Sequence, residues 1–218
     1  SAFGGMGRNL PDGVQANDYG GQVYLMDLKD LKPRPISIGF VPDVGWTHWS
    51  PADGKIYTRC TETQYSNIYR YDPKKDQWEK IETGVEYTDQ ISVCDKGRLA
   101  VARGTSANRP NSVQVIDLKK NSVIETYDPG VEQYAGKSIV FGKVETWIAD
   151  LPNGEKLDGM VYYPADFDPG KKYPLIVYYY GGTSPVTRDF GGRYPKNVWA
   201  GQGYLVYVPN PSGATGFG

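Results

Sequence analysis

The sequence predicts a mixed fold in which propeller-like β repeats are followed by the start of an α/β sheet. The composition favours strands and turns, because 18 of the 218 residues are tyrosine and 27 are glycine. A pattern of short strands recurs every 45 residues in the first half. The second half instead contains a strand, a short helical stretch and another strand in succession, which is typical of an α/β sheet.

The repeat is a short apolar strand that ends in aspartate and runs into a polar turn. It begins at Val23, Ile68 and Val113, each 45 residues after the last. A strand–turn–strand element precedes two of these, at residues 49–57 and 91–100. Because a four-stranded propeller blade has about 40–45 residues, the spacing predicts three consecutive blade-like units. A β-sandwich with coincidental spacing is the alternative.

The residue pattern of the sequence changes near residue 135, where the 45-residue repeats stop. The elements expected beyond it are a strand at 144–149, a hairpin turn at Asn153-Gly154, a strand within 157–164, a strand at 175–180, a helix at 195–202 and a strand at 204–208. The strand at 175–180 is apolar or aromatic throughout. We therefore expect both of its faces to be covered.

Charge and residue counts exclude several classes of function. The net charge is −1, so nothing indicates a nucleic-acid partner or an anionic membrane surface. No apolar run reaches the roughly 20 residues that span a bilayer. One histidine, His48, and two cysteines, Cys60 and Cys94, do not make a zinc site or a disulfide framework. We expect no metal and no cofactor.

Three segments of the second half, at residues 173–182, 203–208 and 210–218, have distinctive motifs. Together they resemble the prolyl oligopeptidase family of serine peptidases, which includes dipeptidyl peptidase IV. The resemblance implies about three blades of an incomplete β-propeller at 1–135 and the N-terminal part of an α/β-hydrolase domain at 136–218. The last segment departs from the family pattern, because Ser212 and Ala214 stand where the family often has arginine and serine.

Tyr180 is the candidate catalytic residue. The resemblance implies that this tyrosine, at the end of a hydrolase strand, donates its hydroxyl to the oxyanion of the tetrahedral intermediate. A phenol is neutral near pH 7 and donates a hydrogen bond, which suits that role. The alternatives are that Tyr180 is one more aromatic residue of a tyrosine-rich strand, or that Tyr178 or Tyr179 holds the position.

No complete catalytic triad is present in the sequence. The nucleophile elbow of such hydrolases reads Gly-x-Ser-x-Gly, and the residue after the serine donates its N–H to the oxyanion. Ser184 is followed by proline, which has no N–H, and Ser106 and Ser212 lack the second glycine. No histidine follows His48. We therefore expect an internal segment of a longer enzyme that ends before the nucleophile.

The predicted function is that of a piece of a serine peptidase that cleaves short peptides through a Ser-His-Asp acyl-enzyme mechanism. An esterase on the same scaffold and a catalytically inactive peptide-binding propeller are the alternatives. The expected partners are a peptide substrate and the remaining part of the same polypeptide. The resemblance also allows an oligomer formed through the hydrolase domain. It leaves the location open between an exported and a cytoplasmic compartment, and slightly favours the exported one.

Overall fold

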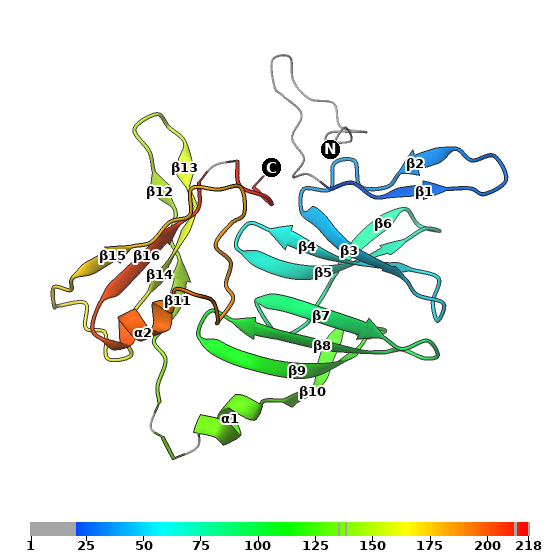
Figure 1. Cartoon of the computed structure of the whole chain (residues 1–218). Coiled ribbons are helices and arrows are strands. Elements are labelled where there is room, and N and C mark those ends of the chain that lie inside the picture. The colour runs from blue at the N-terminus through cyan, green and yellow to red at the C-terminus, as the bar shows by residue number, and fades with distance from the viewer. Residues whose placement is uncertain (1–20, 135, 138, 212, 218) are drawn as a thin grey trace.

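The computed structural model describes residues 21–134, 136–137, 139–211 and 213–217. Strands dominate and form two main sheets, one of eight strands and one of four (Figure 1). The eight-stranded sheet is built from the first half of the chain and the four-stranded sheet from the second half. The position of the predicted boundary, residue 135, lies outside the described residues, as do residues 1–20.

The larger sheet consists of two four-stranded antiparallel meanders. The first contains β3 (Asp43–Trp49), β4 (Ile56–Glu62), β5 (Tyr65–Asp72) and β6 (Gln77–Ile81). The second contains β7 (Tyr87–Val93), β8 (Leu99–Ser106), β9 (Arg109–Asp117) and β10 (Ser122–Tyr127). One parallel bridge, between Ser66 and Tyr87, joins them. A two-stranded sheet of β1 (Tyr24–Met26) and β2 (Pro33–Pro35) precedes both.

The predicted 45-residue repeat is confirmed by the turns that follow its strands. The carboxylates of Asp27, Asp72 and Asp117 each accept a hydrogen bond from the backbone N–H two residues later, at 2.8, 3.0 and 3.0 Å. Four residues after each aspartate the backbone is left-handed, with φ of 55° at Leu31, 53° at Asp76 and 51° at Asn121. The three units therefore share one hairpin geometry, with the repeated strand in the same place each time.

The core of the larger sheet lies where the meanders face each other. Its buried members are Tyr57, Ile68, Ile81, Ile91, Val93, Ala100, Ala102, Ile116 and Leu118. Ile68 and Ile116 come from the third strand of each meander and are fully buried. Two consecutive four-stranded meanders with equivalent strand order and a shared core are the arrangement of a propeller-like fold.

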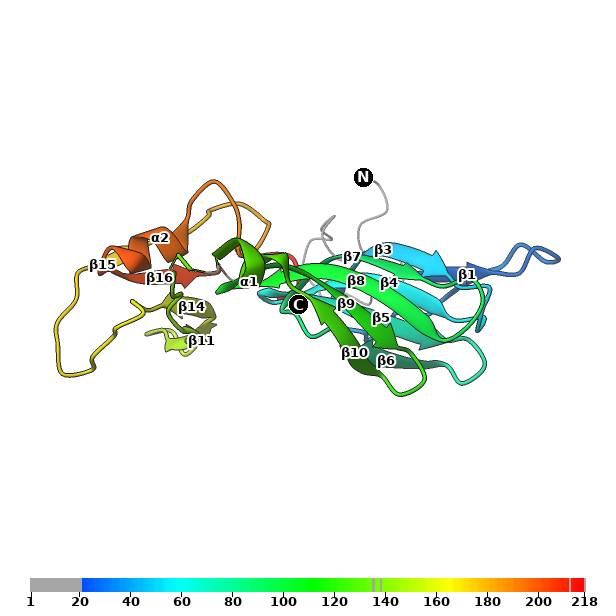
Figure 2. The ribbon, with the colours of Figure 1, turned by 90° about the horizontal axis from the view of Figure 1, so that it is seen from below.

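The smaller sheet has the strand order β11-β14-β16-β15. Its elements are β11 (Val144–Thr146), β14 (Gly159–Tyr162), β15 (Leu175–Val177), α2 (Lys196–Gly201) and β16 (Leu205–Pro209), with the small hairpin of β12 (Ala149–Asp150) and β13 (Lys156–Leu157) beside them. β15 runs parallel to β16, and α2 connects them across one face of the sheet (Figure 2). This matches the predicted order of strand, helix and strand.

Two expectations about the secondary structure are wrong. The strand predicted at 175–180 is a strand only over Leu175–Val177, and the side chains of Leu175 and Val177 are 57% and 52% exposed. The reason is that the face of β15 carrying Leu175 and Val177 is not covered by the described residues, whereas Ile176 on the opposite face packs against the core of the smaller sheet. The structure also adds a six-residue helix, α1 (Pro129–Tyr134), which the apolar pattern did not predict.

Candidate active site at the ends of two parallel strands

The candidate site lies where β15 and β16 end side by side. Parallel strands have their carboxyl ends at the same edge of a sheet, and ligands of α/β proteins bind in the loops that follow those ends. The backbone N–H of Tyr178 donates to the carbonyl of Tyr207 at 2.9 Å, which extends the pairing one residue beyond β15. The chain then continues into Tyr180, Gly181 and Gly182, while Asn210 follows β16 directly.

Tyr180 stands three residues beyond the end of β15, and its side chain is 52% exposed. Its ring folds back over Gly182, since a Cβ on that glycine would lie 2.4 Å from the tyrosine Cε1. Glycine is therefore required at 182 for the ring to hold this position. The exposed phenol next to a close-approaching backbone is available to a bound ligand.

The neighbouring tyrosines differ from Tyr180 in their surroundings. Tyr178 is partly buried, packs against the core of the smaller sheet, and has its ring 5.1 Å from that of Tyr194. Burial raises the pKa of the Tyr178 hydroxyl, and Tyr194 and Tyr180 raise it further. Tyr179 is 67% exposed. Of the three, Tyr178 is a packing residue, whereas Tyr179 and Tyr180 face solvent.

Asn210 fixes the loop after β15 to the loop after β16. Its buried side chain accepts from the N–H of Val186 at 2.8 Å and donates to the carbonyl of Val186 at 3.1 Å. A further bond runs from the N–H of Thr215 to the carbonyl of Thr183 at 2.8 Å. The two loops are thus held together by bonds that replace the pairing of the strands.

Arg188 attaches the same loop to the larger sheet. It is 4% exposed, and its guanidinium donates to the side-chain oxygen of Gln64 at 2.8 Å and to the carbonyl of Val144 at 3.1 Å. Its Nε lies 2.8 Å from Glu86 Oε1, an ion pair without the alignment of a hydrogen bond. Gln64 in turn donates to Asp158 at 3.0 Å. A polar network centred on the buried Arg188 therefore joins the loop after β15 to the larger sheet and to β11.

The charges of this network are only partly balanced by its hydrogen bonds. Burial raises the pKa of Asp158, while the Gln64 bond and the nearby Arg188 charge lower it. The net direction is upward, so desolvation dominates.

The serines and the histidine weighed in the sequence do not assemble into a catalytic group. Ser184 is exposed and precedes Pro185, and Ser106 ends β8 in the larger sheet. Ser212 lies outside the described residues. His48 is in β3, where its ring stacks on Trp46 at 5.8 Å and its buried Nε2 has no hydrogen-bond partner within the described part of the chain. His48 is therefore a packing residue, as predicted.

The described part of the chain has neither a cluster of metal-ligating side chains nor a helix suited to span a membrane. Three or more histidine, cysteine, aspartate or glutamate side chains do not converge on any one point among those residues. No helix of the described ranges has the length and apolar character needed to cross a bilayer.

Comparisons with known proteins point to one group of peptidases. No family model matches the sequence. Dipeptidyl-peptidase 5 of Porphyromonas endodontalis is 31% identical over 163 residues, which cover 74% of this chain and 23% of that protein. The chain thus spans about a quarter of the length of this relative. The shared sequence is long enough to support a common family.

Solved structures of peptidases share the fold of this chain. The dipeptidyl peptidase 4 of Porphyromonas gingivalis matches with a TM-score of 0.69 at 23% identity, covering 90% of this chain and 28% of that one. A prolyl endopeptidase structure matches with a TM-score of 0.66 at 15% identity, covering 90% of this chain and 29% of that one. The chain is related to the prolyl oligopeptidase family. The family resemblance of the sequence is confirmed.

The sequence did not reveal the Arg188 network, which the family relationship leaves unexplained. Gln64 and Arg188 are 124 residues apart, and nothing in the local pattern around either one links them. The nearest signal is the placement of a lone arginine and aspartate in an otherwise uncharged loop, 181–192. That pattern makes the loop distinctive but does not indicate which residues Arg188 contacts.

Proposed function

We propose that this chain is part of a serine peptidase that hydrolyses short peptides through a Ser-His-Asp acyl-enzyme mechanism. In this proposal residues outside the chain supply the nucleophile, the acid and the histidine. Residues 1–135 would form about three blades of a propeller and residues 136–218 the start of an α/β-hydrolase domain. The relatives named as dipeptidyl peptidases and the parallel β15–α2–β16 unit support this assignment.

The observation that carries the proposal is the position of Tyr180. It follows the edge strand β15 at the carboxyl side of the sheet, it is exposed, and Gly181 and Gly182 follow it. In α/β-hydrolases a loop beside the nucleophile supplies one oxyanion donor. The Tyr180 hydroxyl would donate to the carbonyl oxygen as negative charge develops, together with the N–H next to the serine. Because that bond strengthens in the transition state, it accelerates the reaction.

The larger sheet would limit the size of the substrate. It is joined to the candidate site through Arg188 and through the turn at Ala107, whose carbonyl accepts a bond from Asn197 of α2 at 2.8 Å. Ala107 is fully buried within the core of the smaller sheet. A propeller anchored this firmly beside the reacting groups would admit short peptides and exclude folded proteins.

Tyr180→Phe in the longer protein tests the mechanism. The change removes one hydroxyl and almost no volume, so we expect kcat to fall by about 10²–10³ with little change in KM. Tyr179→Phe is the matched control, because that side chain is also exposed, and it should keep full activity. Full activity of Tyr180→Phe, with loss in Tyr178→Phe or Tyr179→Phe, would show that another tyrosine is the donor.

The serine mechanism has a separate test. A longer protein with dipeptidyl-substrate activity should be inactivated by a serine-directed phosphonate, and mass spectrometry should find one adduct on a serine beyond this chain. The 218-residue chain alone should show only background hydrolysis. Phosphonate-sensitive turnover by the short chain would contradict the proposed position of the nucleophile.

A further inference from the structure

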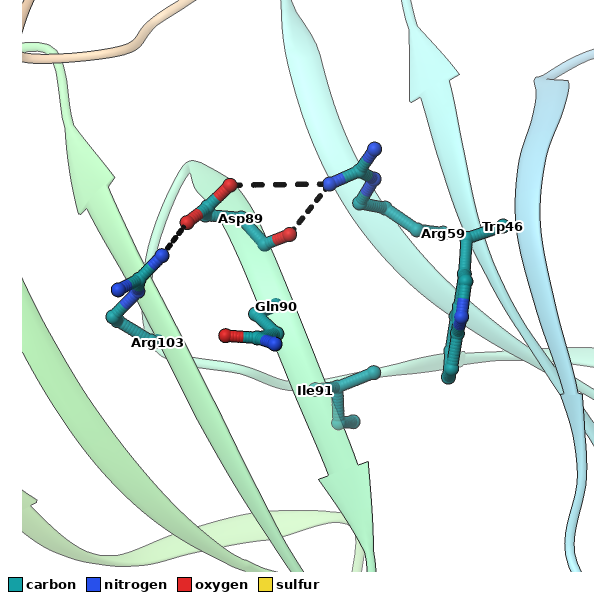
Figure 3. A pocket seen from close by; sticks show the side chains of 6 residues that line it. All are labelled: Trp46, Arg59, Asp89, Gln90, Ile91 and Arg103. Carbon is teal, nitrogen blue, oxygen red and sulfur yellow. Dashed lines mark hydrogen bonds and ion pairs between the residues drawn. The ribbon is translucent and has the colours of Figure 1, made fainter.

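A second polar site lies between the two meanders of the larger sheet, away from the ends of β15 and β16. It is a cavity of about 360 Å³ lined by Trp46, Arg59, Asp89, Gln90, Ile91 and Arg103. Figure 3 shows the Asp89 carboxylate between the two guanidinium groups. The lining comes from β3, β4, β7 and β8, so both meanders contribute to it.

Backbone bulges direct two of these side chains. The register of β3 shifts between Val44 and Thr47, which places Trp46 in the irregular stretch. The register of β7 shifts between Thr88 and Gln90, which places Asp89 in the corresponding stretch of the next meander. Bulges re-aim side chains and occur often beside functional sites. Both first strands are therefore distorted at the wall of one cavity.

The positive charge of the cavity exceeds its negative charge. The Asp89 carboxylate contacts two arginines. It accepts a hydrogen bond from Arg103, and its Oδ1 lies 3.9 Å from Arg59 Nη1. The closer contact of Arg59 is the main-chain carbonyl of Asp89, at 2.5 Å, which carries no net charge. The three charges leave a net of +1, and the Arg59 side chain is 38% exposed. Arg59 uses only Nη1 in the bonds found within the described residues, and its side chain lines the cavity.

We propose that this cavity binds a carboxylate group of a peptide through Arg59 and Arg103. The peptide nature of the ligand rests on the proposed function, whereas the charge preference rests on the cavity itself. A guanidinium presents paired donors that match a carboxylate, and a single excess charge suits a singly charged anion. Trp46, 41% exposed, offers an apolar wall for the adjoining residue of the peptide.

A neighbouring cavity has room for more of the ligand. A second cavity of about 420 Å³ shares Trp46 and Ile91 with the first and runs along β7 to Asp95. The stacked rings of Trp46 and His48 form its other wall. A peptide anchored by its carboxylate at the arginines would extend between these rings and β7.

The test is a binding measurement with three peptides that carry the same N-terminal fluorophore. One ends in a free carboxylate, one is its C-terminal amide, and one is an amide that contains a glutamate. Fluorescence anisotropy with the 218-residue chain should show about 10-fold tighter binding of the free acid than of the plain amide. This is the low end for a charge-assisted bond, because the arginines are partly exposed. Tight binding of the glutamate amide would assign the site to side-chain carboxylates.

Arg59→Gln and Arg103→Gln should each abolish the preference for the acid. Arg98→Gln is the matched control, because Arg98 is exposed, pairs with Asp117 and does not line the cavity. Arg59→Lys keeps the positive charge but not the paired N–H donors of the guanidinium, so it should retain part of the preference for the acid. Circular dichroism confirms folding of each variant. If a variant does not fold, the salt dependence of the unmutated chain is the test. Its preference for the free acid should be lost as the salt concentration rises.

Equal binding of the acid and both amides would overturn the proposal, as would loss of the preference in Arg98→Gln. The result separates this site from the proposed function. Acid preference without hydrolysis by the longer protein would contradict only the peptidase activity. Hydrolysis without acid preference would contradict only the carboxylate site.

Discussion

Replacing Arg188 with methionine tests whether the two sheets depend on the buried network. Methionine keeps much of the side-chain length and removes the charge and all five N–H donors. Glu86 loses its cation, Gln64 loses the donor to its buried side-chain oxygen, and the carbonyl of Val144 loses a bond. The sheets should then separate more readily, because these contacts connect them.

The magnitude follows from the burial of each partner. Removing one member of a buried ion pair costs about 3–5 kcal/mol, because the remaining charge is left uncompensated. The Glu86 side chain is 30% exposed, so water reaches it and the loss lies near the lower limit. We expect the free energy of unfolding to fall by about 3 kcal/mol. For a chain of this size, that is a decrease in Tm of about 6–12 °C.

The assay is urea unfolding followed by circular dichroism, with thermal unfolding as a second measure. Arg193→Met is the matched control, since Arg193 lies five residues further along the chain, is exposed, and contacts only the ring of Tyr194 at 5.6 Å among the interactions of the described residues. It should change stability by less than about 1 kcal/mol. A loss below about 1 kcal/mol in Arg188→Met, or equal losses in both variants, would refute the role of the network.

Two further changes probe the docking of the last loop and the accessibility of the thiols. Gly216 has φ +85°, and a Cβ there would lie 2.8 Å from the Thr61 carbonyl oxygen. Gly213 has the same φ, but a Cβ there would meet open space. Gly216→Ala should therefore lower the unfolding free energy by about 1–2 kcal/mol more than Gly213→Ala in the same urea assay. Equal losses would show that this contact is unimportant. Burial raises the pKa of the Cys60 thiol to about 12, so at pH 8 it is protonated and shielded, while Cys94 is exposed. Iodoacetamide and mass spectrometry should find Cys94 alkylated first and Cys60 only after denaturation; early labelling of Cys60 would contradict the buried placement.

The sequence by itself determined the elements that depend on neighbouring residues. Aspartate at the end of each repeated strand bonds the backbone of its own turn, so the 45-residue spacing predicts three equivalent hairpins without long-range information. The helix at 195–202 and the strand at 204–208 were predicted for the same reason, and α2 and β16 agree to within one or two residues. Tyr180 was identified from a local motif, and its catalytic role stays a prediction.

Only the tertiary structure decided which distant residues meet. The burial of β15 could not be judged from its apolar sequence, because exposure depends on whether other elements cover each face of the strand. Arg188 and Gln64 come together across 124 residues, and Arg59 of the first meander meets Asp89 of the second because the two meanders lie beside each other. A charged residue on a strand has the same local pattern whether it faces solvent or a cavity. Its partners are fixed by packing, which no local pattern encodes.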